Sequence, residues 1–129
     1  MDNAFSKVIE ACARREDTWI NLEIIESYTR LHELGSAHSV EAWKEGTLAG
    51  GLYGVAVGGA FFGESMFHRV TDASKIALVR LVEHLRAQKF VLLDTQWLTP
   101  HLQQFGGIEI SRDHYLRLLR RAVELPCSF

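Results

Sequence analysis

The sequence predicts a mixed α/β (α+β) fold, in which a three-stranded antiparallel meander is joined by one parallel strand and flanked by helices. Three stretches with strand character follow one another across short glycine-containing turns at residues 45–46 and 58–59. An amphipathic helical pattern then precedes the apolar run Phe90 to Leu93. A strand that follows a helix in this way usually pairs in parallel with an earlier strand. The order of elements is therefore ααβββαβαβα, with one sheet covered by helices.

Length and composition are those of one ordinary globular domain spanning residues 1–129, with 47% hydrophobic and 23% charged residues. No apolar run approaches the roughly 20 residues that cross a bilayer, and no signal peptide opens the chain, so we expect a cytoplasmic protein. Cys12 and Cys127 lie far apart, which favours reduced thiols over a disulfide or a metal site. The formal net charge of −2 gives no overall basic field of the kind that attracts nucleic acid.

The first half of the chain changes from helical to strand periodicity at Gly35. Apolar residues at helical spacing predict a first helix, formed around Phe5, Val8, Ile9 and Cys12. Asn21 is the expected N-cap of a second helix that Gly35 ends. The three strands then cover residues 37–44, 47–57 and 60–67. The pair Gly50-Gly51 inside the middle strand predicts either a bulge or a close approach by a ligand.

The second half alternates helices with short strands. Thr71 or Asp72 caps an amphipathic helix, whose expected apolar positions are Ile76, Val79, Leu81, Val82 and Leu85. Phe90 to Leu93 is expected to be a buried strand. A helix opened by Thr99-Pro100 and ended at residues 106–107 should follow, and then a brief strand over residues 108–110. Ser111 caps a last helix, whose apolar positions are Tyr115, Leu118, Leu119 and Val123.

Polar side chains beside large apolar ones mark two strand ends. Asp94 and Gln96 follow the apolar run and share one face of a strand. Open α/β sheets bind ligands at the carboxyl ends of their buried strands, so this pair is a candidate site. A polar pair that only hydrogen-bonds to a neighbouring loop would show the same pattern. Glu64 precedes Met66 and Phe67 at the end of the third strand. It is either a second site carboxylate or the internal partner of a cation such as Lys75 or Arg69.

Short blocks along the chain together carry a resemblance to a known family. They are Thr18-Trp19-Ile20, Leu31-His32-Glu33-Leu34-Gly35, Ala37-His38-Ser39, Gly50-Gly51-Leu52-Tyr53-Gly54-Val55, Gly63-Glu64-Ser65-Met66-Phe67, Ala73-Ser74-Lys75 and Asp94-Thr95-Gln96. In this order, from about Asn3 to Arg121, the chain resembles the leucyl/phenylalanyl-tRNA–protein transferases. The order of elements also looks like the N-acetyltransferase (GNAT-like) acyltransferase fold.

The resemblance implies an aminoacyltransferase that moves leucine or phenylalanine from the 3′ aminoacyl-adenosine end of Leu-tRNA or Phe-tRNA to a protein with N-terminal Arg or Lys. The product is a degradation signal of the N-end rule, and no cofactor or metal is implied. A binding module of the same fold, which recognises basic N-termini or aminoacyl-tRNA ends without transfer, is the alternative. An acyl-CoA-dependent acetyltransferase is disfavoured, because the segment of residues 68–73 has no glycine with which to cradle a pyrophosphate.

The same resemblance assigns roles to individual residues. Asp94 and Gln96 match the catalytic Asp-x-Gln element of the family, and Glu64 matches an active-site carboxylate. The positions that match the apolar donor pocket are Leu52, Phe61, Met66, Leu78 and Leu93. Trp19 and Tyr28 are placed to stack on the terminal adenosine. For the pocket residues and both aromatic residues, simple packing in the core is the competing interpretation.

The chain departs from longer family members at its beginning. Those members carry a further N-terminal domain with a basic face for the tRNA acceptor stem, ahead of the position of Phe5. Because phosphate contacts supply most sequence-independent affinity for nucleic acid, we expect tRNA binding to be weak or to need a second polypeptide. The basic residues near the end of the chain are the other candidate for phosphate contact; they are Arg112, Arg117, Arg120 and Arg121.

Overall fold

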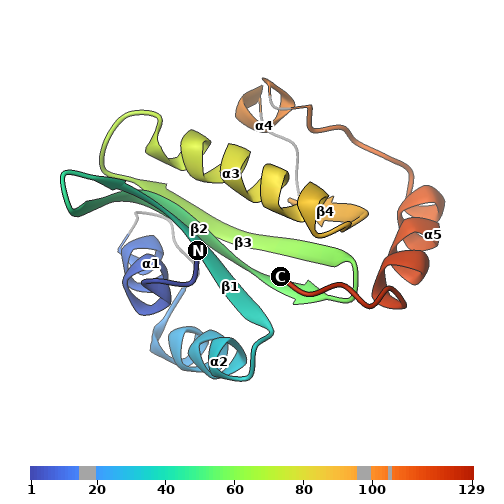
Figure 1. Cartoon of the computed structure of the whole chain (residues 1–129), viewed down its shortest axis with the longest axis horizontal. Coiled ribbons are helices and arrows are strands. Elements are labelled where there is room, and N and C mark those ends of the chain that lie inside the picture. Colours follow the sequence, from blue (N-terminus) through green and yellow to red (C-terminus); the bar gives the residue numbers. More distant parts are fainter. Residues whose placement is uncertain (15–19, 96–99, 105) are drawn as a thin grey trace.

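The protein is described by a computed structural model that covers residues 1–14, 20–95, 100–104 and 106–129. The described chain contains helices and strands in the order that the sequence predicts, with one exception near residue 108 (Figure 1). The helices are α1 (Phe5–Ala13), α2 (Leu22–Glu33), α3 (Ala73–Ala87), α4 (Pro100–Gln104) and α5 (Arg112–Val123). The strands are β1 (Ala37–Lys44), β2 (Thr47–Val57), β3 (Ala60–His68) and β4 (Leu92–Asp94).

The strands form one sheet in the order β1-β2-β3-β4. β1 pairs with β2 and β2 pairs with β3, both antiparallel, so the meander is confirmed. β4 lies parallel to β3, with Ala60 opposite Leu92 and Phe62 opposite Asp94. This parallel pair confirms the expectation for the strand that follows α3, and it places Asp94 at the last register position of β4.

Helices cover both faces of the sheet and enclose two apolar clusters. Figure 1 shows α1 and α2 on one side of the sheet and α3 on the other. The cluster on the α1/α2 side is centred on Phe5, Val8, Ile9, Cys12 and Tyr53. The cluster on the α3 side is centred on Val40, Leu52, Phe61, Leu78 and Leu81. Neighbouring residues of one strand, such as Leu52 and Tyr53, thus enter opposite clusters, as the alternation of a strand requires.

Helix ends follow the local chemistry of the sequence. The side chain of Asn21 accepts a hydrogen bond from the Ile24 backbone N–H at 2.9 Å, and Ser111 accepts one from that of His114 at 3.2 Å, so both expected N-caps are confirmed. Gly35 adopts φ +86° just past the end of α2. Asp72 stands at the N-cap position of α3, but it adopts a left-handed conformation and its carboxylate pairs with Lys75 Nζ at 3.1 Å instead of capping the helix.

The glycine pair in β2 is explained by packing. The register of β1 against β2 shifts between Ala42 and Trp43, so the expected bulge lies beside Gly50. A Cβ atom on Gly50 would come within 2.7 Å of the Ala73 side chain at the start of α3. The close approach at this position is therefore made by a helix of the same chain, and a larger residue would push α3 off the sheet.

Four details of the sequence prediction are wrong; one is Val123, which was expected on the apolar face of the last helix and is 42% exposed. Residues 108–110 form no strand, and Ile108 is 76% exposed. Ile76 and Val79 are 62% and 41% exposed. The face of α3 that packs on the sheet is instead formed by Ala77, Leu78, Leu81 and Leu85. The last strand is only half-buried and begins at Leu92, because the Phe90 N–H is still bonded to the Leu85 carbonyl oxygen at the end of α3. In the described part of the chain, no helix is both long and apolar enough to cross a membrane.

Candidate active site

Asp94 is held by the last helix. The hydroxyl of Tyr115 on α5 donates a hydrogen bond of 2.6 Å to Oδ2 of the carboxylate. Burial, together with this bond and the negative charge of Asp94, raises the pKa of Tyr115 to about 12, so the hydroxyl stays protonated and donating at neutral pH. The bond fixes one carboxylate oxygen at the carboxyl end of β4.

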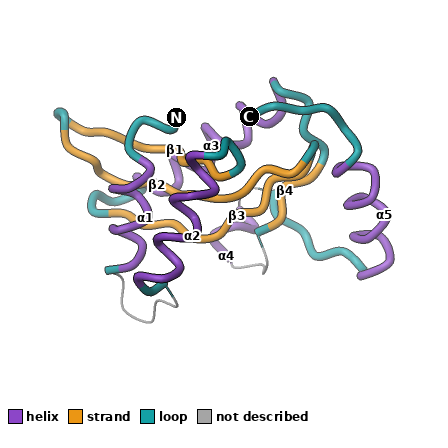
Figure 2. The backbone as a smooth tube through the Cα atoms, turned by 90° about the horizontal axis from the view of Figure 1, so that it is seen from below, coloured by secondary structure: helices purple, strands orange, loops and turns teal. Residues whose placement is uncertain are grey.

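The fold brings α5 to this place through the turn between β2 and β3. The backbone N–H of Gly59 donates to the Ala122 carbonyl oxygen at 2.6 Å. A Cβ atom on Gly58, which has φ +56°, would lie 2.5 Å from the same oxygen. Only glycine permits this approach, and the contact anchors the end of α5 beside the start of β3. Figure 2 shows α5 at the end of the molecule, beyond β4.

Glu64 is the extra residue of a bulge in β3. In the register between β2 and β3, Tyr53 is opposite Ser65 and Gly54 is opposite Gly63. No residue of β2 is therefore opposite Glu64. Bulges of this kind change the direction of a side chain and are frequent beside active sites. The carboxylate of Glu64 hydrogen-bonds to Tyr28 of α2, and burial together with the nearby carboxylate raises the pKa of Tyr28 to about 12. The sequence alone left Lys75 or Arg69 as alternative partners, but Lys75 pairs with Asp72 and Arg69 lies over the Phe67 ring.

Tyr53 forms the buried floor beside Glu64. Its ring is fully buried and meets the ring of Tyr28 edge-on, with the centroids 5.4 Å apart. Its hydroxyl has no hydrogen-bond partner among the residues that the structure describes. Burial, with a smaller effect from Cys12, Tyr28 and Glu64, raises the pKa of Tyr53 far above its usual range.

The two carboxylates lie on one side of the sheet. Leu93 packs into the cluster on the α3 side, so the neighbouring Asp94 side chain lies on the opposite face, which α1 and α2 cover. Glu64 lies on that same face, because its partner Tyr28 comes from α2. β3 and β4 are adjacent, and Asp94 is opposite Phe62. Asp94 and Glu64 therefore lie on the same face of two adjacent strands.

The residues expected to form a donor pocket do meet in space. All of them belong to the cluster on the α3 side; they are Leu52, Phe61, Met66, Leu78 and Leu93. Leu52, Phe61 and Leu78 are at most 4% exposed. Met66 and Leu93 are half-buried, which makes them the members of the set that have surface for a ligand.

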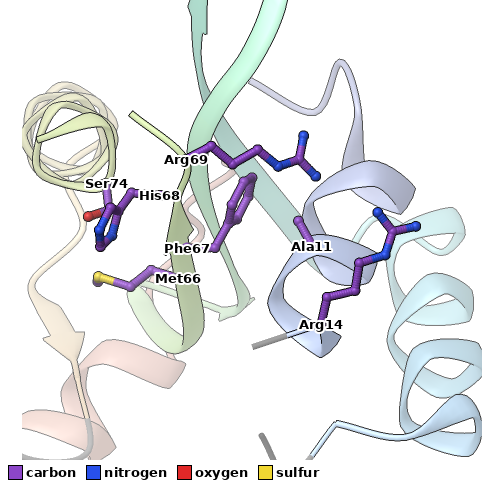
Figure 3. A pocket seen from close by; sticks show the side chains of 7 residues that line it. All are labelled: Ala11, Arg14, Met66, Phe67, His68, Arg69 and Ser74. Carbon is purple, nitrogen blue, oxygen red and sulfur yellow. The ribbon is translucent and has the colours of Figure 1, made fainter. Parts of the chain in front are cut away.

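A pocket of about 750 Å³ opens at the carboxyl end of β3, next to Met66 (Figure 3). The described residues that line it are Ala11, Arg14, Met66, Phe67, His68, Arg69 and Ser74. They come from the end of α1, the end of β3 and the start of α3. Only Met66 of this group was expected from the sequence to be a site residue.

Other expected site residues have different positions. Trp19 and Gln96 lie outside the described residues. His38 is bonded to Asp2 at 2.8 Å and His32 to the Ala37 carbonyl oxygen at 2.8 Å, so both rings have structural partners within the fold. Within the described ranges, no group of three His, Cys, Asp or Glu residues is arranged to hold a metal ion.

Tyr115 is the residue that the sequence analysis missed, since it was assigned to the apolar face of the last helix. The sequence offered one indication of its role. Tyr115 lies in the first turn after the Ser111 N-cap, and from there a tyrosine hydroxyl can reach the end of a neighbouring strand.

Comparison with solved structures shows the fold. The described fold is similar to that of the PaiA N-acetyltransferase of Thermoplasma acidophilum, solved in complex with coenzyme A, with a TM-score of 0.53. The match covers 84% of this chain and 85% of that chain at 12% sequence identity. The GNAT-like acyltransferase fold expected from the order of elements is thereby confirmed.

Comparison with known sequences shows the family. The family model described as leucyl/phenylalanyl-tRNA protein transferase matches residues 1–120. Proteins named leucyl/phenylalanyl-tRNA–protein transferase from Akkermansia muciniphila and Gloeobacter violaceus are 61% and 57% identical to the chain over 127 and 126 residues, which is 96% and 98% of it. The chain spans 66% and 65% of the length of these two relatives. On this sequence match, the chain belongs to the leucyl/phenylalanyl-tRNA protein transferase family.

Proposed function

We propose that this chain transfers leucine or phenylalanine from aminoacyl-tRNA to the N-terminal Arg or Lys of acceptor proteins, which marks them for degradation. Family membership supports the reaction class. The observation that carries the assignment to a site is the pair of carboxylates, Asp94 and Glu64, on one face at the end of the β3–β4 pair. The family match favours transfer over a binding module of the same fold.

The reaction needs positioning more than strong acids or bases. The α-amine of the acceptor attacks the aminoacyl ester; the new C–N bond forms, the ester C–O bond breaks, and the tRNA 3′-oxygen leaves with a proton. An α-amine has a pKa near ~7.7–8.0, so a useful neutral fraction exists at physiological pH. The enzyme therefore gains mostly by holding amine and ester together.

Asp94 is the proposed stabiliser of the positive charge that develops on the attacking nitrogen. Its Oδ2 atom is already occupied by the Tyr115 hydroxyl. Gln96 is the proposed acceptor of a hydrogen bond from the amine, because its side-chain oxygen accepts without being a strong base. Tyr115 is a positioning residue, since it acts through Asp94.

Glu64 is the proposed recognition group for the cationic acceptor, through its ammonium or its Arg or Lys side chain. Tyr28 donates to this carboxylate and so fixes its orientation. The stacking role on the terminal adenosine that the family suggests for Trp19 and Tyr28 is retained as part of the proposal.

The donor side chain is proposed to rest on the cluster of the α3 side, at the half-buried Met66 and Leu93. A flexible thioether accommodates both a branched and an aromatic side chain. Leu52, Phe61 and Leu78 then act as the rigid apolar wall behind them. We further propose that residues 1–129 act as one domain in the cytoplasm.

A transfer assay tests the proposal. Labelled leucine on tRNA is incubated with the chain and a peptide that begins with Arg, and with a matched peptide that begins with Glu. We expect label on the Arg peptide alone. No label on either peptide at enzyme concentrations where aminoacyl-tRNA is bound would reject transfer and leave the binding module.

A further inference from the structure

The pocket at the end of β3 has a chemical character opposite to that of the carboxylate face. Arg14 and Arg69 lie at its rim, and His68 also lines it. No acidic residue is among the described residues that line it. Two acids close in sequence to this lining are already engaged elsewhere, because Glu64 is hydrogen-bonded to Tyr28 and Asp72 is paired with Lys75. The pocket is therefore locally cationic in a chain whose formal net charge is −2.

Among the described residues, the guanidinium groups of Arg14 and Arg69 have no carboxylate partner. Arg69 is instead positioned by its own backbone, whose N–H donates to the Ala49 carbonyl oxygen at 2.7 Å, and by the Phe67 ring, 5.5 Å below its guanidinium carbon. Both donors are thus held ready for an external anion.

Ser74 gives the pocket a buried polar group. The residue is only 6% exposed, lines the pocket in the first turn of α3, and its hydroxyl has no hydrogen bond to any residue that the structure describes. A serine hydroxyl that lines a pocket adds one hydrogen-bond donor for an anion bound there. Figure 3 shows Ser74 and His68 on the α3 side of β3, and Arg14 and Arg69 on the α1 side.

We infer that this pocket binds a backbone phosphate of the RNA donor, the one next to the terminal adenosine. The inference rests on the proposed function and deepens it. Met66 joins the two places, because it belongs both to the candidate donor cluster and to the pocket wall. An aminoacyl-adenosine end carries its acyl group and its 5′-phosphate on one ribose, so a phosphate site adjacent to the acyl site fits the geometry of that ligand.

The charge of the pocket excludes the other substrate. The acceptor N-terminus is cationic, and Arg14 and Arg69 repel it, whereas Glu64 attracts it. The molecule therefore separates a cationic end for the donor phosphate from an acidic face for the acceptor amine. With the donor phosphate in the cationic pocket and the acceptor amine at the acidic face, both substrates would lie along β3. The aminoacyl ester would then lie between the two sites.

The test compares two non-hydrolysable 3′-phenylalanylamino-adenosine analogues, one with and one without a 5′-phosphate, by calorimetric titration of the full chain. We expect the phosphorylated analogue to bind about tenfold more tightly, as charge-assisted hydrogen bonds to one phosphate provide. Increasing salt should reduce this advantage, with a log–log slope larger by about 0.7 for the phosphorylated analogue. In the variant with both Arg14→Gln and Arg69→Gln the advantage should disappear, while the unphosphorylated analogue keeps its affinity.

Arg86→Gln is the matched control, because Arg86 is an exposed arginine at the other end of α3, and it should change neither affinity. Equal binding of both analogues to the unmodified chain would overturn the phosphate site and leave the proposed function intact. Binding of neither analogue would overturn both. Displacement of the phosphorylated analogue by coenzyme A at an equal concentration would assign the pocket to a small-molecule phosphate and overturn the RNA source.

Discussion

Tyr115 and Asp94 join the last helix to the parallel strand, because the tyrosine hydroxyl donates to Oδ2 of the carboxylate at 2.6 Å. The bond links residues that are 21 positions apart in the sequence. It fixes the carboxylate that we propose to be catalytic, and it leaves the other oxygen of that carboxylate to be oriented by its surroundings.

Tyr115→Phe should therefore slow transfer without unfolding the protein. Loss of the hydroxyl removes one hydrogen bond to a half-buried charge, which costs about 1 kcal/mol of unfolding free energy. A mispositioned carboxylate should lower kcat about tenfold and leave the KM for the peptide unchanged. Single-turnover rates and urea denaturation measure the two effects. Asp113→Asn, an exposed change on the same helix, is the control. An unaltered kcat would show that the bond only fastens α5.

Glu64→Gln should weaken the use of the acceptor. The neutral amide keeps the shape of the side chain but loses the attraction for a cationic N-terminus, so the KM for an Arg-initiated peptide should rise about tenfold. The same substitution should bring the pKa of Tyr28 down from about 12, because a negative neighbour is removed. Peptide titrations of the rate check the first effect. Glu23→Gln, at an exposed position on α2, should leave KM as it was.

Met66→Ala and Leu78→Ala should separate ligand contact from core packing. Leu78 is 4% exposed and well inside the α3-side cluster, so its loss should cost about 2–5 kcal/mol of unfolding free energy. Met66 is half-buried, so its loss should cost less and should slow transfer of phenylalanine more than of leucine. The measurements are the ratio of the phenylalanine and leucine transfer rates and the thermal unfolding curve of each variant. Together they distinguish ligand contact from core packing. Equal losses with both donors would place Met66 in the core alone.

All three tyrosines of the chain should titrate late. Burial and neighbouring carboxylates raise the pKa of Tyr28 and Tyr115 to about 12, and that of Tyr53 further. Since the unfolded chain ionises near 10, these groups stabilise the fold fully below about pH 10, and this stability is lost as the pH rises toward 12. The tyrosinate absorbance of the folded protein should stay flat up to about pH 11. A full tyrosinate step near pH 10 in folded protein would contradict the described burial.

The sequence predicted the order of elements well, because local signals determine it. Asn21 and Ser111 have side chains that cap helices, and the glycine turns at residues 45–46 and 58–59 leave little choice of strand pairing. The errors arose where tertiary contacts decide. Ile76 carries an apolar side chain but faces solvent, because the close contact of Ala73 with Gly50 sets the rotation of α3.

The sequence could predict only those site residues whose chemistry stands out in a short motif. Asp94 and Glu64 are polar residues in apolar surroundings, and such residues stand out in any sequence. Tyr115 does not stand out, since a helical tyrosine reads equally well as an apolar position. The cationic pocket was missed for a different reason. Arg14, Arg69 and Ser74 come from three separate segments, and only the fold brings them to one opening.

Asp94→Ala in the transfer assay is the most direct test of the central claim, that the carboxylate face at the β3–β4 end carries the chemistry. Folding is checked by circular dichroism, and Asp113→Ala, an exposed change on α5, is the matched control. The account predicts a loss of about 100-fold or more in the rate of leucine transfer to an Arg-initiated peptide for Asp94→Ala, and near-normal rates for the control. A folded Asp94→Ala protein that transfers leucine at the unmodified rate would contradict it.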